Sequence, residues 1–343
     1  MIWNNNPHPS IGVIGAGSWG TALAWLLAGN GYPVHLWSYE IETTDQIKNE
    51  RENKNFLPGV ILPESVRPTT NLREVLDQKE MLVLAIPSHF FRGILKQVRS
   101  FLSSIEPECL WISATKGIEN ETLLTMSGVL KEILDPSFYP FIGCLSGPTF
   151  AKEVSRELPT AVTLAAVEEN TARKAQQFFS NGFFRVYTNN DLLGVELGGA
   201  LKNVIALAAG IGDGLGLGHN SRAALITRGL AEICRLGEKM GAQRPTFFGL
   251  AGIGDLVLTC TGELSRNRTV GLRLGRGELL PAILSSMTMV AEGIKTTKAA
   301  YQLASREGIE MPLVSKIYSI LYEDSNPRSA VKELMNRDLR AEG

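Results

Sequence analysis

The chain has 343 residues and a mass of 37.4 kDa, enough for about two domains. Hydrophobic residues make up 44% and charged residues 20%, so the sequence can form a sizeable core and lacks the composition of a disordered protein. The formal net charge is -1 and no long basic run occurs. This balance makes nucleic acid and anionic membrane surfaces poor candidate partners.

The N-terminus and the cysteines point to the cytoplasm. The first ten residues, "MIWNNNPHPS", lack the basic and apolar regions of a signal peptide. We find no charge-free apolar run of membrane-spanning length. The cysteines lie far apart, without the spacing of a disulfide framework or a zinc site; they are Cys109, Cys144, Cys234 and Cys260. We therefore expect a cytoplasmic protein with no membrane insertion, reduced thiols and no metal.

The first half of the chain alternates between strand and helix patterns. Short apolar runs predict strands at 11–15, 33–38, 81–87, 109–115, 140–148, 160–166 and 183–188. Helix-like stretches, such as 21–31, lie between most of them. This alternation predicts a Rossmann-type α/β domain with a mainly parallel, doubly wound sheet that helices cover on both faces.

The pattern changes near Asp191, after which only helices are predicted. Helical periodicity marks residues 221–241, 291–308 and 312–324. We therefore predict an α/β domain over 1–190 and an all-helical domain over 191–343. No Gly/Ser linker separates them, so we expect closely packed domains with a cleft between them.

A glycine-rich turn follows the first predicted strand. Gly15, Gly17 and Gly20 form G-x-G-x-x-G between a strand and a helix, the context that makes this pattern informative. Gly15 suits a tight turn, Gly17 a close approach to a pyrophosphate, and Gly20 close packing of helix and strand. The N-terminus of the following helix favours an anion. The sequence therefore predicts that residues 1–190 bind a dinucleotide.

The end of the second strand bears on the choice of dinucleotide. An acidic residue there suits the ribose of NAD, and an arginine suits the phosphate of NADP. Ser38, Tyr39 and Glu40 occupy this place, with no arginine beside them. Glu40 favours NAD or simply begins the next helix, and Arg51 could fold back. The preference stays open.

Polar residues follow two later strands. Lys116 lies at the carboxyl end of the strand over 109–115, where open α/β sheets bind ligands. Gly147, Pro148 and Thr149 open a helix after the strand over 140–148, where small residues let backbone N–H groups reach a ligand. Alternatively, Lys116 could lie in an ordinary solvated loop, and residues 147–149 could be an ordinary helix start without a ligand.

One lysine stands inside an apolar segment. Residues 196–216 are almost wholly apolar or glycine, yet Lys202 lies among them. Asp255 is the single acidic residue in "FFGLAGIGDLVLTC", and a buried carboxylate requires a partner, so we expect it to pair with Lys202. It could instead cap a helix that begins after Gly254. Burial disfavours a charged amine, which suits proton exchange near neutral pH. We expect the glycines before Lys202 to leave room for substrate, although the lysine could instead snorkel to the surface.

A polar cluster suits a phosphate. Ser265, Arg266, Asn267 and Arg268 combine arginine with small hydrogen-bonding groups, as phosphate or carboxylate recognition requires. Glu292 lies at a predicted helix start, where a carboxylate interacts favourably with the helix dipole. None of the four histidines lies in a recognisable catalytic triad motif.

Taken together, these segments resemble the bacterial-type NAD(P)-dependent glycerol-3-phosphate dehydrogenases. The motifs are "GAGSWGTALA", "ATKGIE", "SGPTFAKEV", "GGALKNVIALAAGI", "AALITRGLAEI", "GIGDLVLTC", "SRNR" and "VAEG", in the family's order from about residue 11 to 325. The resemblance implies interconversion of dihydroxyacetone phosphate and sn-glycerol 3-phosphate for phospholipid synthesis. It also implies a C-terminal domain like that of 6-phosphogluconate dehydrogenase, and a homodimer.

The resemblance also implies roles for individual residues. Lys202 is the implied proton donor and acceptor. The implied substrate contacts are Lys116, Gly147, Thr149, Lys202, Asp255, Ser265, Arg266 and Asn267. The expected coenzyme site comprises Gly15, Gly17, Ser18, Trp19, Gly20, Tyr39, Lys116, Ala151, Arg266, Val290 and Glu292. Many relatives carry arginine or histidine where Tyr39 stands, which again leaves the choice between NADH and NADPH open.

Two other functions remain as alternatives. A β-hydroxyacid or 6-phosphogluconate dehydrogenase has a similar layout and also uses a helix lysine, but its motif places asparagine four residues after that lysine, where this chain has Ala206. A non-catalytic NADP sensor would bind the dinucleotide but would need neither Lys202 nor the "SRNR" cluster.

Overall fold

The computed structural model describes residues 9–287, 289, 291–339 and 341. The chain forms two compact units. Unit 1 comprises residues 1–116 and 124–196, and unit 2 comprises residues 117–123 and 197–343. The division falls within one long helix rather than before it, so the boundary at residue 190 stays a prediction.

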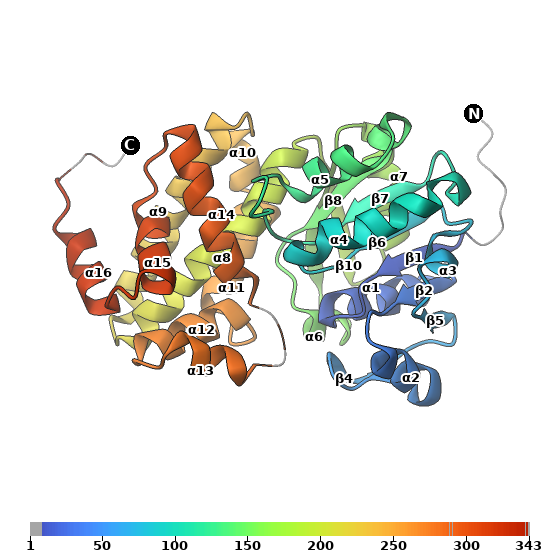
Figure 1. The fold of residues 1–343 in the computed structure, drawn as a ribbon, viewed down its shortest axis with the longest axis horizontal. Coiled ribbons are helices and arrows are strands. Elements are labelled where there is room, and N and C mark those ends of the chain that lie inside the picture. Colours follow the sequence, from blue (N-terminus) through green and yellow to red (C-terminus); the bar gives the residue numbers. More distant parts are fainter. Residues whose placement is uncertain (1–8, 288, 290, 340, 342–343) are drawn as a thin grey trace. The chain divides into compact units, whose positions relative to one another are not determined.

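Unit 1 is built on an eight-stranded sheet (Figure 1). Its strand order is β10-β9-β8-β7-β6-β1-β2-β5, and each pair is parallel except β8 and β9. The strands are β1 (Ile11–Ile14), β2 (Val34–Trp37), β5 (Val66–Thr69), β6 (Met81–Leu84), β7 (Leu110–Ser113), β8 (Ile142–Ser146), β9 (Thr160–Ala166) and β10 (Phe184–Asn189). The predicted mainly parallel sheet is confirmed.

The connections of the sheet create a ligand-binding position. From β1 the chain runs outward through β2 to β5, then returns to place β6 on the other side of β1. In open α/β sheets, ligands bind beyond the carboxyl ends of the strands where this direction reverses. The glycine turn follows β1, so the fold brings it to that position.

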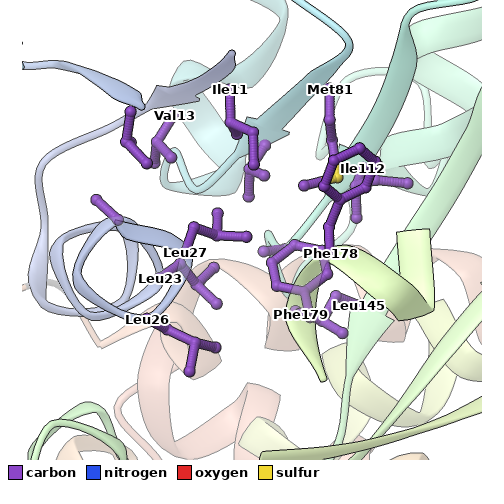
Figure 2. Close-up of a cluster of buried hydrophobic side chains, with 14 of the residues drawn as sticks. Ile11, Val13, Leu23, Leu26, Leu27, Met81, Ile112, Leu145, Phe178 and Phe179 are labelled. Carbon is purple, nitrogen blue, oxygen red and sulfur yellow. The ribbon is translucent and has the colours of Figure 1, made fainter. Parts of the chain in front are cut away.

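Helices cover both faces of this sheet. On one face, α1 (Ser18–Gly29) and α7 (Glu169–Phe179) pack against β1, β6 and β7. Figure 2 shows Leu23, Leu26 and Leu27 of α1 directed toward the same core as Phe178 and Phe179 of α7. Spacings of three and four residues place these leucines on one helix face. The other helices of unit 1 are α2 (Ile41–Glu50), α3 (Leu72–Leu76), α4 (Ser88–Val98), α5 (Met126–Ile133) and α6 (Ala151–Val154), with 3₁₀ turns at Arg99–Ser104 and Pro136–Phe141.

The sequence patterns missed three strands between residues 52 and 69. A small antiparallel pair joins β3 (Glu52–Asn53) to β4 (Leu57–Ile61), and β5 adds the edge strand of the main sheet. Prolines at 58, 63 and 68 interrupt the apolar periodicity of this stretch. Pro68 lies within β5, and an edge strand tolerates the loss of one backbone donor.

From residue 197 onward, the described part of unit 2 consists of helices joined by turns, which confirms the predicted all-helical domain. Its elements are most of α8 (Leu192–Gly214), then α9 (Gly218–Lys239), α10 (Arg244–Phe247), the π-helical turn η3 (Leu250–Gly254), α11 (Asp255–Thr261), α12 (Arg266–Gly275), α13 (Leu280–Ser285), α14 (Glu292–Glu307), α15 (Pro312–Tyr322) and α16 (Pro327–Met335). Among the described residues, α8 is the one single helix that is long and apolar enough to cross a membrane, and 94% of that apolar window is buried within the protein. A bent pair, 244–261 with 266–275, passes the same test only when counted as one span. Burial of this kind is typical of the core helix of a soluble protein.

A buried carboxylate holds the start of α15. Glu232 of α9 accepts hydrogen bonds from the backbone N–H groups of Leu313 (2.7 Å) and Val314 (3.2 Å). These groups have no partner within their own helix. Burial nevertheless raises the pKa of Glu232 to about 7, an effect that the two N–H groups oppose.

This raised pKa predicts a pH-dependent stability. Between about pH 4.5 and 7 the folded protein keeps a proton that the unfolded chain has released, so the stability contribution of Glu232 falls as the pH rises through this window. Over the whole window, Glu232 lowers the free energy of unfolding by about 3 kcal/mol as the pH rises. Glu232→Gln removes the titration and keeps one acceptor. In urea unfolding, we expect the wild type to lose about 2 kcal/mol relative to the variant between pH 5 and 7.5. A constant difference would contradict the assignment.

Candidate functional site

The glycine turn has the geometry that a dinucleotide requires. Gly15 adopts φ +115°, and a Cβ there would lie 2.4 Å from the carbonyl oxygen of Ala85. A Cβ on Gly20 would lie 1.8 Å from the carbonyl oxygen of Gly15, so α1 packs directly against the turn. Gly17, the N-cap of α1, has open space where its Cβ would be. The first turn of α1 carries no acidic residue, which leaves the N-terminus suited to an anion.

The β3–β4 segment braces this turn. Asn53 is fully buried, and its amide donates hydrogen bonds to the carbonyl oxygen of Ala16 and to Oγ1 of Thr21, both at 2.8 Å. Its oxygen accepts the N–H of Phe56 (3.2 Å), while the hydroxyl of Ser18 donates to the carbonyl oxygen of Phe56 (2.5 Å). The loop conformation therefore depends on a segment that the sequence patterns did not predict.

Other residues expected at the coenzyme site lie nearby in unit 1. The indole N–H of Trp19 is buried and has no hydrogen-bond partner among the described residues. Tyr39 follows β2, is 76% exposed, and contacts the Trp37 ring edge-on with centroids 6.3 Å apart. Glu40 caps α2 and accepts the hydroxyl of Ser38 (3.1 Å). Ala151 begins α6.

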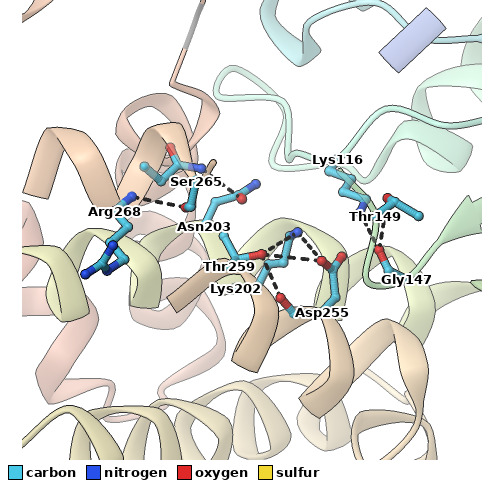
Figure 3. A network of polar contacts seen from close by, with 10 residues as sticks. Lys116, Gly147, Thr149, Lys202, Asn203, Asp255, Thr259, Ser265 and Arg268 are labelled. Atoms are coloured by element: carbon cyan, nitrogen blue, oxygen red, sulfur yellow. Dashed lines mark hydrogen bonds and ion pairs between the residues drawn. The ribbon is translucent and has the colours of Figure 1, made fainter. Parts of the chain in front are cut away.

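The candidate residues after β7 and β8 come together. The ammonium group of Lys116 donates to the carbonyl oxygen of Gly147 (2.9 Å), and the hydroxyl of Thr149 donates to the same oxygen (3.2 Å) (Figure 3). Gly147 adopts φ +139°, and a Cβ would lie 2.9 Å from Val162. The two neighbouring strand ends thus present one cationic group and one hydroxyl on a fixed turn.

In unit 2, Lys202 and Asp255 form the expected pair. Both side chains are buried, and Asp255 has no exposed surface. The ammonium group of Lys202 donates to the carboxylate of Asp255 and to the hydroxyl of Thr259 (2.8 Å) (Figure 3). That hydroxyl in turn donates to the backbone carbonyl of Asp255 (2.6 Å). Since Lys202 is 6% exposed, the alternative of a snorkelling lysine is wrong.

The expected space beside the lysine helix is filled at one glycine. A Cβ on Gly198 would lie 2.6 Å from the carbonyl oxygen of Ala251, because the π-helical turn η3 packs against α8 at this point. The prediction that the glycines leave room for substrate is therefore wrong for Gly198. Its absent side chain instead allows η3 to approach, and η3 leads directly into Asp255. π-Helical turns are frequent at functional sites.

The start of α12 carries the phosphate-binding candidates. Ser265 is the N-cap, and its hydroxyl accepts the N–H of Arg268 (3.2 Å). The amide of Asn267 donates to Oδ1 of Asn203 and accepts the N–H of Gly293, both at 2.9 Å. Asn267 therefore joins α12 to α8, next to Lys202, and to the first turn of α14.

The two arginines of "SRNR" differ in their surroundings. Arg268 is held by a carboxylate, since its guanidinium pairs with Asp213 at 2.8 Å. Arg266 is exposed as a whole residue, but surrounding groups partly desolvate its guanidinium and lower its pKa. The nearby carboxylate of Glu292 opposes this shift. Glu292 begins α14, as expected. Val290 lies outside the described residues.

Two family models match the chain in sequence. The N-terminal model of NAD-dependent glycerol-3-phosphate dehydrogenase matches residues 10–172, and the C-terminal model matches residues 191–332. A glycerol-3-phosphate dehydrogenase [NAD(P)+] of Geobacter sulfurreducens is 56% identical over 332 residues, which cover 97% of this chain and 98% of that protein.

The chain belongs to the NAD-dependent glycerol-3-phosphate dehydrogenase family. The enzyme of the same name from Syntrophobacter fumaroxidans is 53% identical over 98% of both chains. The crystal structure of glycerol-3-phosphate dehydrogenase from Coxiella burnetii superposes with a TM-score of 0.91 at 39% identity, covering 96% of this chain and 99% of that chain. D-mandelate dehydrogenase, at 13% identity and a TM-score of 0.58, shares the fold alone. These relatives favour the glycerol-3-phosphate dehydrogenase function over both alternatives, and they support NAD(P) as coenzyme.

Three further polar residues belong to this candidate site although no sequence pattern predicted them there. Thr259 lies four residues after Asp255 on the same helix face, a spacing that could have revealed it. Asn203 directly follows Lys202, so it could have been found as a polar residue in the same apolar segment. Asn53 gave no signal, because its role depends on the β3–β4 pairing.

Asn53 supplies a prediction for coenzyme binding. Asn53→Ala removes two donors that hold the glycine turn, each worth about 1 kcal/mol. We expect the Kd for NADH, measured by fluorescence titration, to rise about 10- to 30-fold, the upper value corresponding to the loss of about 2 kcal/mol. Asn181→Ala is the control, because Asn181 also bonds backbone N–H groups in unit 1 but at the start of β10. Equal coenzyme affinity of the two variants would show that Asn53 has no special part in binding.

Proposed function

We propose that this enzyme transfers a hydride reversibly between NAD(P)H and dihydroxyacetone phosphate, giving sn-glycerol 3-phosphate, with Lys202 as the general acid and base. The observation that carries the proposal is the buried group of Lys202, Asp255 and Thr259 on α8 and α11. The family models and relatives support the same reaction.

The described residues fit a dinucleotide coenzyme. The space beside Gly17 and the N-terminus of α1 suit its phosphates. When bound, the coenzyme supplies or accepts the hydride. The chain supplies the orientation of the substrate and the proton.

Lys202 provides the proton chemistry. In the reducing direction its ammonium group donates a proton to the carbonyl oxygen of the substrate as negative charge develops there, and in the oxidising direction the neutral amine accepts the hydroxyl proton. Asp255 compensates the charge of the buried ammonium. The hydroxyl of Thr259 donates to a backbone carbonyl, so its oxygen accepts from Lys202 and fixes the direction of the amine.

Arg266 and Asn267 bind the phosphate of the substrate in this proposal. They occupy the first turn of α12, where backbone N–H groups and the helix dipole also favour an anion. The guanidinium of Arg266 can form charge-assisted hydrogen bonds with a phosphate dianion. Lys116, Gly147 and Thr149 form a second group of substrate contacts on unit 1, and this assignment rests on the resemblance and on their shared turn.

A direct assay tests the function. Purified enzyme with NADH should lose absorbance at the NADH wavelength after dihydroxyacetone phosphate is added, and sn-glycerol 3-phosphate should accumulate in equal amount. A protein that binds NADH but gives no turnover with either NADH or NADPH would contradict the proposal and would favour a sensor.

The coenzyme assay also tests the choice between NADH and NADPH. Arg51, which could have folded back toward a phosphate, instead donates to the carbonyl oxygens of Leu62 and Val66. Tyr39 is exposed, and Glu40 places a carboxylate at the end of β2. We expect either coenzyme to support turnover. A preference for NADPH above about 1,000-fold in kcat/KM, roughly 4 kcal/mol, would reveal a phosphate contact that these residues do not provide.

We further infer a cytoplasmic homodimer whose product feeds phospholipid synthesis. The four cysteines are free and buried, as is usual in a reducing compartment. The dimer and the metabolic role are supported by the family resemblance. Light scattering after gel filtration tests the dimer: a mass near twice 37.4 kDa is expected, and a monomer would contradict it.

A further inference from the structure

Helices α8 and α12 pack with their backbones in contact. A Cβ on Gly210 would lie 2.1 Å from the carbonyl oxygen of Arg268, and one on Gly214 would lie 2.3 Å from that of Leu272. From the other side, a Cβ on Gly271 would lie 2.2 Å from the carbonyl oxygen of Leu207. Gly275 behaves in the same way against Ile211, at 2.4 Å. Each helix therefore presents two glycines four residues apart, and no larger side chain fits between them.

A carboxylate fastens the same crossing. Asp213, on the last turn of α8, accepts Nε and a terminal nitrogen of Arg268, both at 2.8 Å, on one oxygen. Its other oxygen accepts Nε (2.9 Å) and a terminal nitrogen (2.6 Å) of Arg222 from α9. The Asp213 side chain is 8% exposed, so these bonds are largely shielded from solvent. We call Asp213, Arg222 and Arg268 the Asp213 clasp.

A third contact lies toward the other end of the crossing. The side-chain amide of Asn267 on α12 donates to Oδ1 of Asn203 on α8, the residue after Lys202. From Asn203 to Gly214, α8 thus meets α12 from Asn267 to Gly275 in the same order. These contacts fix the position of the first turn of α12, which carries Arg266 and Asn267, along the axis of α8.

From these contacts we infer that the Asp213 clasp and the glycine crossing position the phosphate-binding turn of α12 relative to Lys202. Asp213 lies 11 residues after Lys202, about 16 Å along the helix, so it acts through α12 rather than on the reacting atoms. Arg268 is two residues from Arg266, and any shift of α12 moves both. The inference rests on the proposed function, which assigns the phosphate to Arg266 and Asn267.

Arg268→Lys tests the clasp. Lysine keeps the positive charge but has a single nitrogen, so it cannot reproduce the two contacts that Nε and a terminal nitrogen of Arg268 make with Asp213. We expect KM for dihydroxyacetone phosphate and the inhibition constant of inorganic phosphate to rise together, about 10-fold. Values of kcat within about twofold and an unchanged KM for NADH are also expected. Arg273→Lys is the control, because Arg273 lies on α12 but pairs with Glu278 instead of α8.

The glycine crossing supplies a second, independent pair of variants. Gly210→Ala places a methyl group against the carbonyl of Arg268, which is backbone and cannot move alone. Gly212→Ala, on the same helix, meets the end of the Leu225 side chain at 3.3 Å, which can adjust. For Gly210→Ala we expect the same rise in KM for dihydroxyacetone phosphate and in the inhibition constant of inorganic phosphate as for Arg268→Lys. For Gly212→Ala we expect both constants to stay near their wild-type values.

The outcomes separate this inference from the proposed function. If Arg266→Ala impairs turnover of dihydroxyacetone phosphate while Arg268→Lys lowers only thermal stability, the positioning role is overturned and the function stands. If Arg266→Ala itself has no effect, the phosphate assignment fails and the positioning role fails with it. A fall in kcat with unchanged KM for Arg268→Lys would also overturn the inference.

Discussion

Lys202→Met should lower kcat for dihydroxyacetone phosphate at least about 100-fold, the low end of general acid–base effects, while NADH binds normally. Methionine keeps the bulk of the side chain in the apolar segment of α8 but carries no proton. Steady-state turnover and fluorescence titration of NADH measure the two quantities. Lys239→Met is the control, because Lys239 is an exposed lysine at the end of α9.

Loss of Lys202 has a structural consequence that the experiment must separate from catalysis. Asp255 is fully buried, and removal of its partner leaves an uncompensated carboxylate, which destabilises proteins by about 3–5 kcal/mol. The double variant Lys202→Met with Asp255→Asn removes that charge and should recover stability without recovering kcat. A folded Lys202→Met enzyme with near-normal kcat would remove Lys202 from the mechanism.

Arg266→Ala should lower kcat/KM for sn-glycerol 3-phosphate about 30- to 1,000-fold, because a lost charge-assisted contact costs roughly 2–4 kcal/mol. Glycerol, which lacks the phosphate, should show no comparable change. Arg276→Ala, at the opposite end of α12, is the control for effects on the helix itself. Equal kcat/KM of wild type and Arg266→Ala for the phosphorylated substrate would exclude this residue from phosphate binding.

Part of this site was predictable because its signal is local. The strand–glycine–helix pattern of residues 11–31 specifies both the turn and its chemistry, since Gly15 and Gly20 sit where a side chain would collide with backbone. Lys202 was conspicuous as a charge in an apolar helix, and Asp255 as the one carboxylate in another apolar run. The physical cost of burying either charge alone is what allowed their pairing to be predicted.

Other parts depend on contacts between distant segments. The β3–β4 pair and the edge strand β5 were not predicted because three prolines interrupt the apolar periodicity of this stretch. The role of Asn53 depends on the β3–β4 pair, so it was not predicted either. The space expected beside Gly198 was wrong because only the fold brings η3 against α8. Nothing in "SRNR" distinguishes Arg266 from Arg268; the distinction comes from Asp213, 55 residues before Arg268.

The sequence by itself determined the two kinds of architecture, the dinucleotide turn and the lysine–aspartate pair, because periodicity, glycine spacing and the cost of buried charge act over a few neighbouring residues. The tertiary structure alone decided which polar groups hold the scaffold together. Arg268 could have bound a phosphate, but its guanidinium pairs with Asp213 through Nε and one terminal nitrogen at the crossing of α8 and α12. Such an assignment depends on where two helices meet, and that is set by the close packing of Gly210 and Gly271 rather than by either segment alone.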